Sequence, residues 1–139
     1  MQAGEFNISG TIPITKYLLS LNENMQKTLM GDNINISCSV EMWIDFINFK
    51  IRPLEGFLIK DKKATLTEEA SKMALADLEI VMNELNHHMK LRSFMVLHSV
   101  TLADLYLILN LYPFYNYVFD DKKKQSFPLP PLFVLLFFV

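Results

Sequence analysis

The feature that most constrains this 139-residue chain is a helix start at residues 101–104, TLAD. Thr101 is a suitable N-cap, because its hydroxyl can accept a backbone N–H that the first helical turn leaves unpaired. Asp104 can accept the N–H of Thr101 in return, and its charge suits the positive end of the helix dipole. Val100 and Leu105 flank this capping box and are predicted to pack together as a hydrophobic staple. We expect the box to serve folding, with a cost of roughly 0.5–2 kcal/mol for the loss of Thr101 and no more for the loss of Asp104.

Apolar side chains recur at helical spacing along most of the chain, which predicts an all-α fold. The predicted helices and helical segments cover residues 12–19, 37–49, 53–58, 67–89, 101–111 and 120–125. Two prolines are expected to interrupt them, because Pro53 disfavours helix at Arg52 and Pro113 ends the helix before it. The polar segment 22–33, with a break at Gly31, is predicted to be irregular, and the sequence offers no good strand pair.

Composition argues against several classes of protein. The net charge of −2 disfavours a general nucleic-acid surface, which is normally basic. The single cysteine, Cys38, excludes an internal disulfide and a Cys-based zinc site, and it fits a reducing compartment. Residues 1–14 do not resemble a signal peptide. The apolar run at 132–139 is far shorter than the ~20 residues that span a bilayer, so we expect a cytoplasmic protein without a membrane contact.

No group of side chains predicts catalysis, a cofactor or a metal ion. His87 and His88 are adjacent, so on a helix they point about 100° apart and cannot bind one metal ion from one face. His98 follows beyond a predicted turn, which makes a three-histidine zinc site the weaker interpretation. The acidic pairs at 68–69 and 120–121 are typical of solvated helix starts. We therefore predict no catalytic, cofactor-binding or metal-binding residue.

The capping box is part of a longer pattern over residues 83–85 (NEL), 91–96 (LRSFMV) and 100–104 (VTLAD). This pattern resembles the C-terminal helical domain of the glutathione S-transferase (GST) superfamily, in which a Ser/Thr-x-x-Asp box starts a buried central helix. It is most similar to the translation-associated branch, which includes the gamma subunit of elongation factor 1 and the GST-like domains of aminoacyl-tRNA synthetases and their auxiliary proteins. Leu97 departs from the family, which usually has Gly at this turn. The resemblance implies a GST C-terminal-like helical bundle that lacks most of the thioredoxin-like half.

The N-terminal segment extends the resemblance. Residues 9–18 look like the last helix of the thioredoxin-like half, and Gly10-Thr11 takes the apparent position of the acidic-Ser pair that holds glutathione in a transferase. About ten residues precede this segment, whereas a βαβ unit needs roughly 30. The predicted divisions are residues 1–30, the remnant of a thioredoxin-like half; 31–128, the GST C-terminal-like helical domain; and 129–139, an atypical apolar tail.

The resemblance implies a non-catalytic docking domain of the translation machinery, bound to protein partners through another GST-like domain. Association with an elongation factor and association with a synthetase both stay open. The alternatives are a truncated glutathione transferase and a nonfunctional isoform fragment, the latter suggested by the tail. Ile12, Ile14 and Leu18, together with the tail at 132–139, would leave apolar surface uncovered, which predicts self-association or a companion protein. No direct nucleic-acid contact is predicted.

Overall fold

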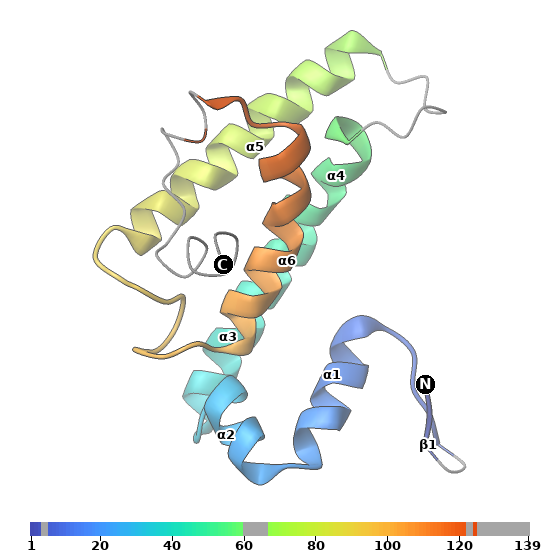
Figure 1. Cartoon of the computed structure of the whole chain (residues 1–139), viewed down its shortest axis with the longest axis vertical. Coiled ribbons are helices and arrows are strands. Elements are labelled where there is room, and N and C mark those ends of the chain that lie inside the picture. The colour runs from blue at the N-terminus through green and yellow to red at the C-terminus, as the bar shows by residue number, and fades with distance from the viewer. Residues whose placement is uncertain (4–5, 60–66, 122–123, 125–139) are drawn as a thin grey trace.

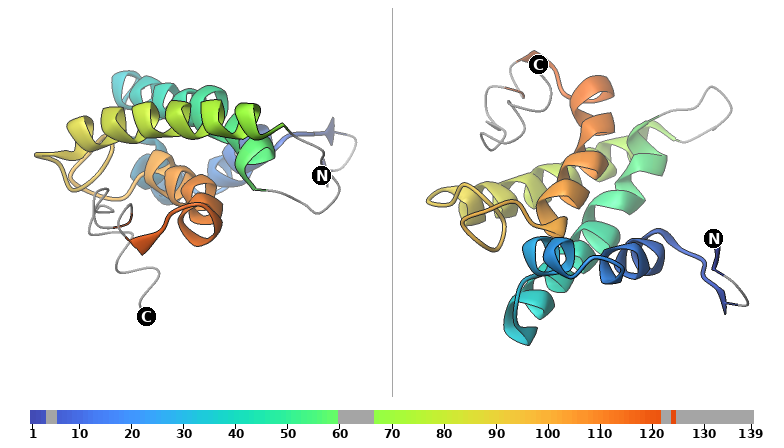
Figure 2. Two further views of the ribbon diagram at one scale, coloured as in Figure 1. Left: turned by 90° about the horizontal axis from the view of Figure 1, so that it is seen from above. Right: turned by 60° about the horizontal axis from the view of Figure 1, so that its bottom comes forward.

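The chain folds as a helical bundle in the computed structural model, which describes residues 1–3, 6–59, 67–121 and 124. Three helical elements follow one another along one rod: α3 (Ile34–Phe46), the π-helix η1 (Ile47–Ile51) and α4 (Arg52–Leu58). The long helix α5 (Glu68–Met89) packs beside α4, and α6 (Leu102–Tyr117) packs against α3 and η1. Figure 2 shows α5 and the rod in one layer, with α6 in a second layer against them. The predicted all-α class is confirmed.

The N-terminal elements lie at one end of this bundle (Figure 1). Two strands of two residues each, β1 (Gln2–Ala3) and β2 (Phe6–Asn7), form an antiparallel pair that the sequence did not predict. Helix α1 (Thr11–Ser20) follows and packs against α2 (Glu23–Met30). An ion pair of 2.6 Å between Lys16 Nζ and Glu41 Oε1 joins α1 to α3.

Helix α2 occupies a segment that was predicted to be irregular, so that prediction is wrong. The Asn22 side chain caps the helix by accepting the N–H of Met25 at 3.1 Å, and Lys27 pairs with Glu23 one turn away. Met30, at the other end, is buried in the core. A local cap and one buried anchor therefore outweigh the polar composition. The predicted break at Gly31 is present, with a φ of 89° that favours glycine.

The rod does not stop at Pro53, contrary to the prediction of a helix interruption there. A proline ring clashes with the carbonyl four residues earlier in an α-helix, and it offers no N–H. The chain accommodates Pro53 by widening into the π-helix, in which the N–H of Arg52 bonds to the carbonyl of Ile47, five residues back. Ile47 and Ile51 are fully buried within this wider turn, and their packing keeps the rod continuous.

Helix α6 also passes through a proline, so its predicted end at residue 111 is wrong. Pro113 cannot donate to the carbonyl of Leu109, and the helix nevertheless continues to Tyr117. Phe114, the next residue, is completely buried, and Leu111 is nearly so. Burial of these side chains holds the last turns in place.

The hydrophobic core gathers around α6, which crosses the bundle and has buried residues along most of its length. Its partners are apolar side chains of the rod and of α5, including Val40, Ile44, Ile47, Ile51, Leu78, Val81 and Leu85. Within the described residues, no helix has both the length and the apolar composition that a membrane crossing requires. The predicted tail at 129–139 lies outside the described residues. Of the predicted helix at 120–125, one backbone bond is described, from Lys124 N–H to the Asp120 carbonyl at 2.9 Å.

Candidate functional site

The start of α6 is organised by the buried carboxylate of Asp104. Its Oδ1 accepts the N–H of Met95 at 2.8 Å, and its Oδ2 accepts both the N–H of Thr101 at 2.9 Å and the hydroxyl of Thr101 at 2.6 Å. Asp104 and Thr101 are the two buried polar side chains among the described residues. All three hydrogen bonds of this group are therefore accepted by the carboxylate of Asp104.

Thr101 and Asp104 have the reciprocal arrangement of a capping box. The Thr101 hydroxyl donates to Asp104 Oδ2, in addition to the capping-box contact that it receives from the backbone of Asp104. A charged acceptor with three donors contributes more than a neutral hydroxyl with one. From these bonds we expect the loss of Asp104 to cost more than the loss of Thr101. Val100 and Leu105 are both half-buried beside the box, and their staple contact stays a prediction.

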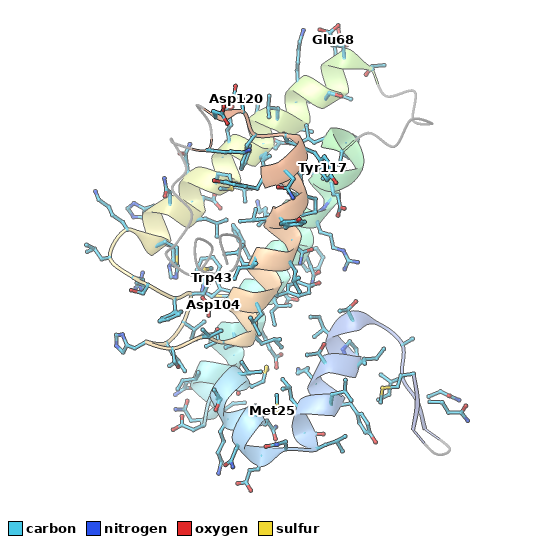
Figure 3. All side chains as sticks on the ribbon, in the orientation of Figure 1. Met25, Trp43, Glu68, Asp104, Tyr117 and Asp120 are labelled. Atoms are coloured by element: carbon cyan, nitrogen blue, oxygen red, sulfur yellow. The ribbon has the colours of Figure 1, made fainter. Side chains whose placement is uncertain are left out.

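A second group of contacts holds the arm that leads into α6. Arg92 donates to the carbonyl of His88 at 3.1 Å and to its Nδ1 at 3.2 Å, while His88 Nε2 lies 2.8 Å from the Met95 carbonyl. Because arginine only donates, Nδ1 of His88 is the acceptor and Nε2 carries the proton. The Trp43 ring packs on the imidazole at 4.3 Å between centroids, and Figure 3 shows Trp43 and Asp104 in the same region of the bundle.

These contacts give the arm its shape without a left-handed residue. Met95 is held on both sides of its backbone, its N–H by Asp104 and its carbonyl by His88. Leu97 does not need the positive φ that a glycine would supply, because the described chain has no positive φ outside glycine. The sequence pattern included Arg92, but it gave no sign of the roles of His88 and Trp43. The four-residue spacing from His88, in the last turn of α5, to Arg92, just after the helix, is the signal that could have predicted the role of His88.

The titratable residues singled out in the sequence do not assemble a reactive group. His87 and His98 are exposed, while His88 is committed to the arm. In the part of the chain that the structure describes, no three His, Cys, Asp or Glu side chains gather where they could hold a metal ion. Cys38 is exposed on α3, not buried as a small apolar residue would be.

A polar link joins η1 to α6 beside the Asp104 group. The hydroxyl of Tyr106 donates to Asn48 Oδ1 at 2.7 Å and lies 3.5 Å from the Arg52 guanidinium. Asn48 and Arg52 reach Tyr106 from the π-helix and the residue after it. This link, like the Asp104 group, stabilises the crossing of two helices.

The exposed apolar side chains are the second candidate feature. At the junction of α1 and α2, Leu18 is 51% exposed, and Leu21 and Met25 are also exposed; Ile12 and Ile14 are half-buried. The predicted uncovered surface at this end is therefore present at Leu18 and reduced at the two isoleucines.

A longer apolar row lies on the rod. Ile34, Met42, Phe49 and Phe57 follow one another at intervals of seven or eight residues, about two helical turns. Met42 and Phe49, seven residues apart, lie on one side of the rod, and Ile34 and Phe57, each eight residues further along, lie about 80° around the helix from them. All four are exposed, and Ile34 and Phe49 are 73% and 77% exposed. We call these four residues the outer stripe. The sequence predicted the core-facing side of this helix, and the exposed apolar residues on its other side were not predicted.

Comparison with curated proteins identifies elongation factor 1-gamma proteins as relatives. "Probable elongation factor 1-gamma 2" of Arabidopsis thaliana is 32% identical over 108 residues, which cover 76% of this chain and 26% of the relative. "Probable elongation factor 1-gamma 1" of the same plant is 26% identical over 136 residues, or 92% of this chain and 31% of the relative. The chain thus spans about a quarter to a third of the length of these relatives. No protein-family model matches it.

Solved structures show the same fold. The GST-like domain of elongation factor 1-gamma from Saccharomyces cerevisiae superposes with a TM-score of 0.86 at 15% identity, over 94% of this chain and 63% of that one. Human glutathione-S-transferase T1-1 in its apo form superposes with a TM-score of 0.69 at 14% identity, over 94% of this chain and 59% of that one.

Proposed function

This chain is a GST C-terminal-like domain distantly related to elongation factor 1-gamma, and from this premise we propose that it is a non-catalytic docking module of the translation machinery. Its partner in this proposal is another GST-like domain, from an elongation factor or from a synthetase assembly, and its place is the cytoplasm. The relation to elongation factor 1-gamma supports a role in the translation machinery. The exposed apolar surface supports protein docking as that role.

The outer stripe is the observation on which the docking role rests. Phe49 and Ile34 are large apolar side chains exposed at more than 70% on a rigid rod. The core side of the same rod is fully packed, so the stripe is not a product of loose folding. An apolar row of this kind on a well-packed element is typical of a protein interaction surface.

The polar residues of the bundle support a non-catalytic role. Asp104 and His88 have hydrogen-bond partners that hold the backbone, and Tyr106 links two helices. Each of these three side chains therefore makes hydrogen bonds that stabilise the fold. A truncated transferase stays the alternative, which the similarity to the human transferase structure makes worth testing.

A binding experiment with charge-introducing variants tests the docking role. The full chain is titrated with purified GST-like domains of elongation factor 1-gamma and of aminoacyl-tRNA synthetases, and the dissociation constant is measured by calorimetry. We expect one of them to bind, and Phe49→Glu to weaken that binding at least about tenfold because it places a charge within the apolar contact.

Leu91→Glu is the matched control, because Leu91 is a large apolar residue that is even more exposed than Phe49 but lies outside the outer stripe, after α5. It should leave the affinity unchanged. Equal losses from both variants would contradict the placement of the surface. Failure of every GST-like partner to bind would favour the nonfunctional fragment.

A second experiment addresses catalysis. Purified chain should neither bind glutathione measurably in calorimetry nor conjugate it to a chlorodinitrobenzene-type electrophile. Micromolar glutathione binding, with turnover above that of the heat-denatured protein, would replace the docking proposal by the transferase alternative.

A further inference from the structure

Helix α5 presents a second exposed surface, on the far side of the bundle from α6. Leu78, Val81 and Leu85 face the core. Ile80 lies two residues after Leu78, about 200° around the helix, and Met73 lies seven residues before Ile80 on the same side. These two apolar side chains, Ile80 at 58% and Met73 at 70%, are exposed because they lie on the side of the helix away from its buried residues.

Carboxylates alternate with these apolar residues. Asp77 and Glu84 follow Met73 and Ile80 by four residues each, so the order along one line of the helix is Met73, Asp77, Ile80, Glu84. We call these four residues the α5 face. Both acids are exposed.

Within the described residues, no ion pair is found for the acids of the α5 face. The ion pairs found among the described residues join Lys16 to Glu41, Lys27 to Glu23 and Lys72 to Glu68. None of these pairs involves Asp77 or Glu84. A surface helix usually supports such acids with lysine or arginine four residues away, and here the corresponding positions 81 and 88 hold Val81 and His88, which are committed to the core and to the arm.

We propose that the α5 face binds a lysine- or arginine-rich amphipathic helix of a partner protein. The two apolar anchors are seven residues, or about 10.5 Å, apart, and so are the two carboxylates. A partner helix with aliphatic residues at heptad spacing, and basic residues between them, matches both sets at once. The negative charge selects a basic partner and excludes an acidic one.

This surface is separate from the outer stripe, so the inference does not depend on the proposed function. The outer stripe lies on the rod and has an apolar row, whereas the α5 face lies on another helix and combines apolar and acidic residues. The two surfaces can therefore be disabled independently.

A defined peptide serves as the probe. It has about 18 residues, five helical turns, with leucine at the a and d heptad positions and lysine elsewhere; a twin peptide has glutamate in place of lysine. Each is titrated into the isotope-labelled full chain, and amide shifts are followed by NMR. We expect the lysine peptide to shift residues on and beside the α5 face, and the glutamate twin to cause no shift.

Variants separate a specific contact from general attraction between opposite charges. D77K/E84K should weaken binding of the lysine peptide at least about tenfold, because two attractions become repulsions. D45K/E55K is the matched control: it changes the net charge equally, at exposed acids of the rod, and should weaken binding less than about threefold.

Three results would overturn the proposal. Equal losses from D77K/E84K and D45K/E55K would show attraction to net charge alone. Amide shifts confined to other helices would place the contact elsewhere. Sedimentation that shows a dimer of the free chain, dissociated by D77K/E84K, would show that a second copy occupies this face instead.

Discussion

The first turn of α6 and its last turns are held by different interactions. At the beginning, three donors converge on the Asp104 carboxylate, and they hold both the helix and the arm before it. At the end, Pro113 leaves a backbone bond unmade, and the buried ring of Phe114 keeps the helix intact. Hydrogen bonds therefore determine where this helix starts, while packing determines how far it continues.

A disturbance of the last turns of α6, which are held by apolar packing, should lower the stability of the fold more than a disturbance of its first turn. Phe114→Ala removes a completely buried ring, so we expect a loss of about 3–5 kcal/mol in the free energy of unfolding. Denaturant titration followed by circular dichroism measures this loss. Phe114→Leu, which keeps most of the volume, should lose clearly less. A loss under about 1 kcal/mol for the alanine variant would show that packing does not hold the last turns.

The second largest effect is expected at the first turn of α6, where the Asp104 carboxylate accepts the hydrogen bonds. Asp104→Ala leaves the N–H groups of Met95 and Thr101 buried without an acceptor, so we expect a loss of about 2–4 kcal/mol in the free energy of unfolding. Hydrogen exchange should rise first at these two amides and leave the amides after Pro113 protected. Uniform exchange along all of α6 would break the distinction between its two ends.

These two ends also show which features the sequence could predict. The start was predictable because Thr101 and Asp104 are three residues apart and form a local motif. The bond from Asp104 to Met95 was not, since it spans an irregular arm whose path depends on Arg92 and His88. The continuation past Pro113 depends on the burial of Phe114 in the assembled core, which no local rule contains.

The same reasoning applies to the candidate surfaces. Met42 and Phe49 fall outside the three- and four-residue spacing of Val40, Ile44 and Ile47, so their exposure could have been predicted from the helical pattern. The π-helix that continues the rod was not, because it depends on the buried positions of Ile47 and Ile51 around Pro53.

A variant of Thr101 tests whether its hydroxyl stabilises the start of α6 through the Asp104 carboxylate. Thr101→Ala removes a hydroxyl that donates to Asp104, and we expect a loss of roughly 0.5–2 kcal/mol in the free energy of unfolding. Because the hydroxyl acts through the carboxylate, the double variant with Asp104→Ala should cost little more than Asp104→Ala alone. Thr101→Ser, which keeps the hydroxyl, is the control. Additive losses would mean that the two side chains stabilise the helix separately.

The smallest effect is expected at Pro113. Pro113→Ala restores the N–H that can bond to the Leu109 carbonyl, which favours the folded chain, but it also frees the unfolded chain, which opposes that gain. The two effects nearly offset, so we expect a change within about 1 kcal/mol in the free energy of unfolding and an unchanged helical signal in circular dichroism. Pro113→Ala should stabilise the chain more when it is combined with Phe114→Leu, because the end of the helix then has weaker packing and depends more on the restored hydrogen bond. A loss of stability in both backgrounds would show that the proline itself, and not the ring of Phe114, supports this end of the helix.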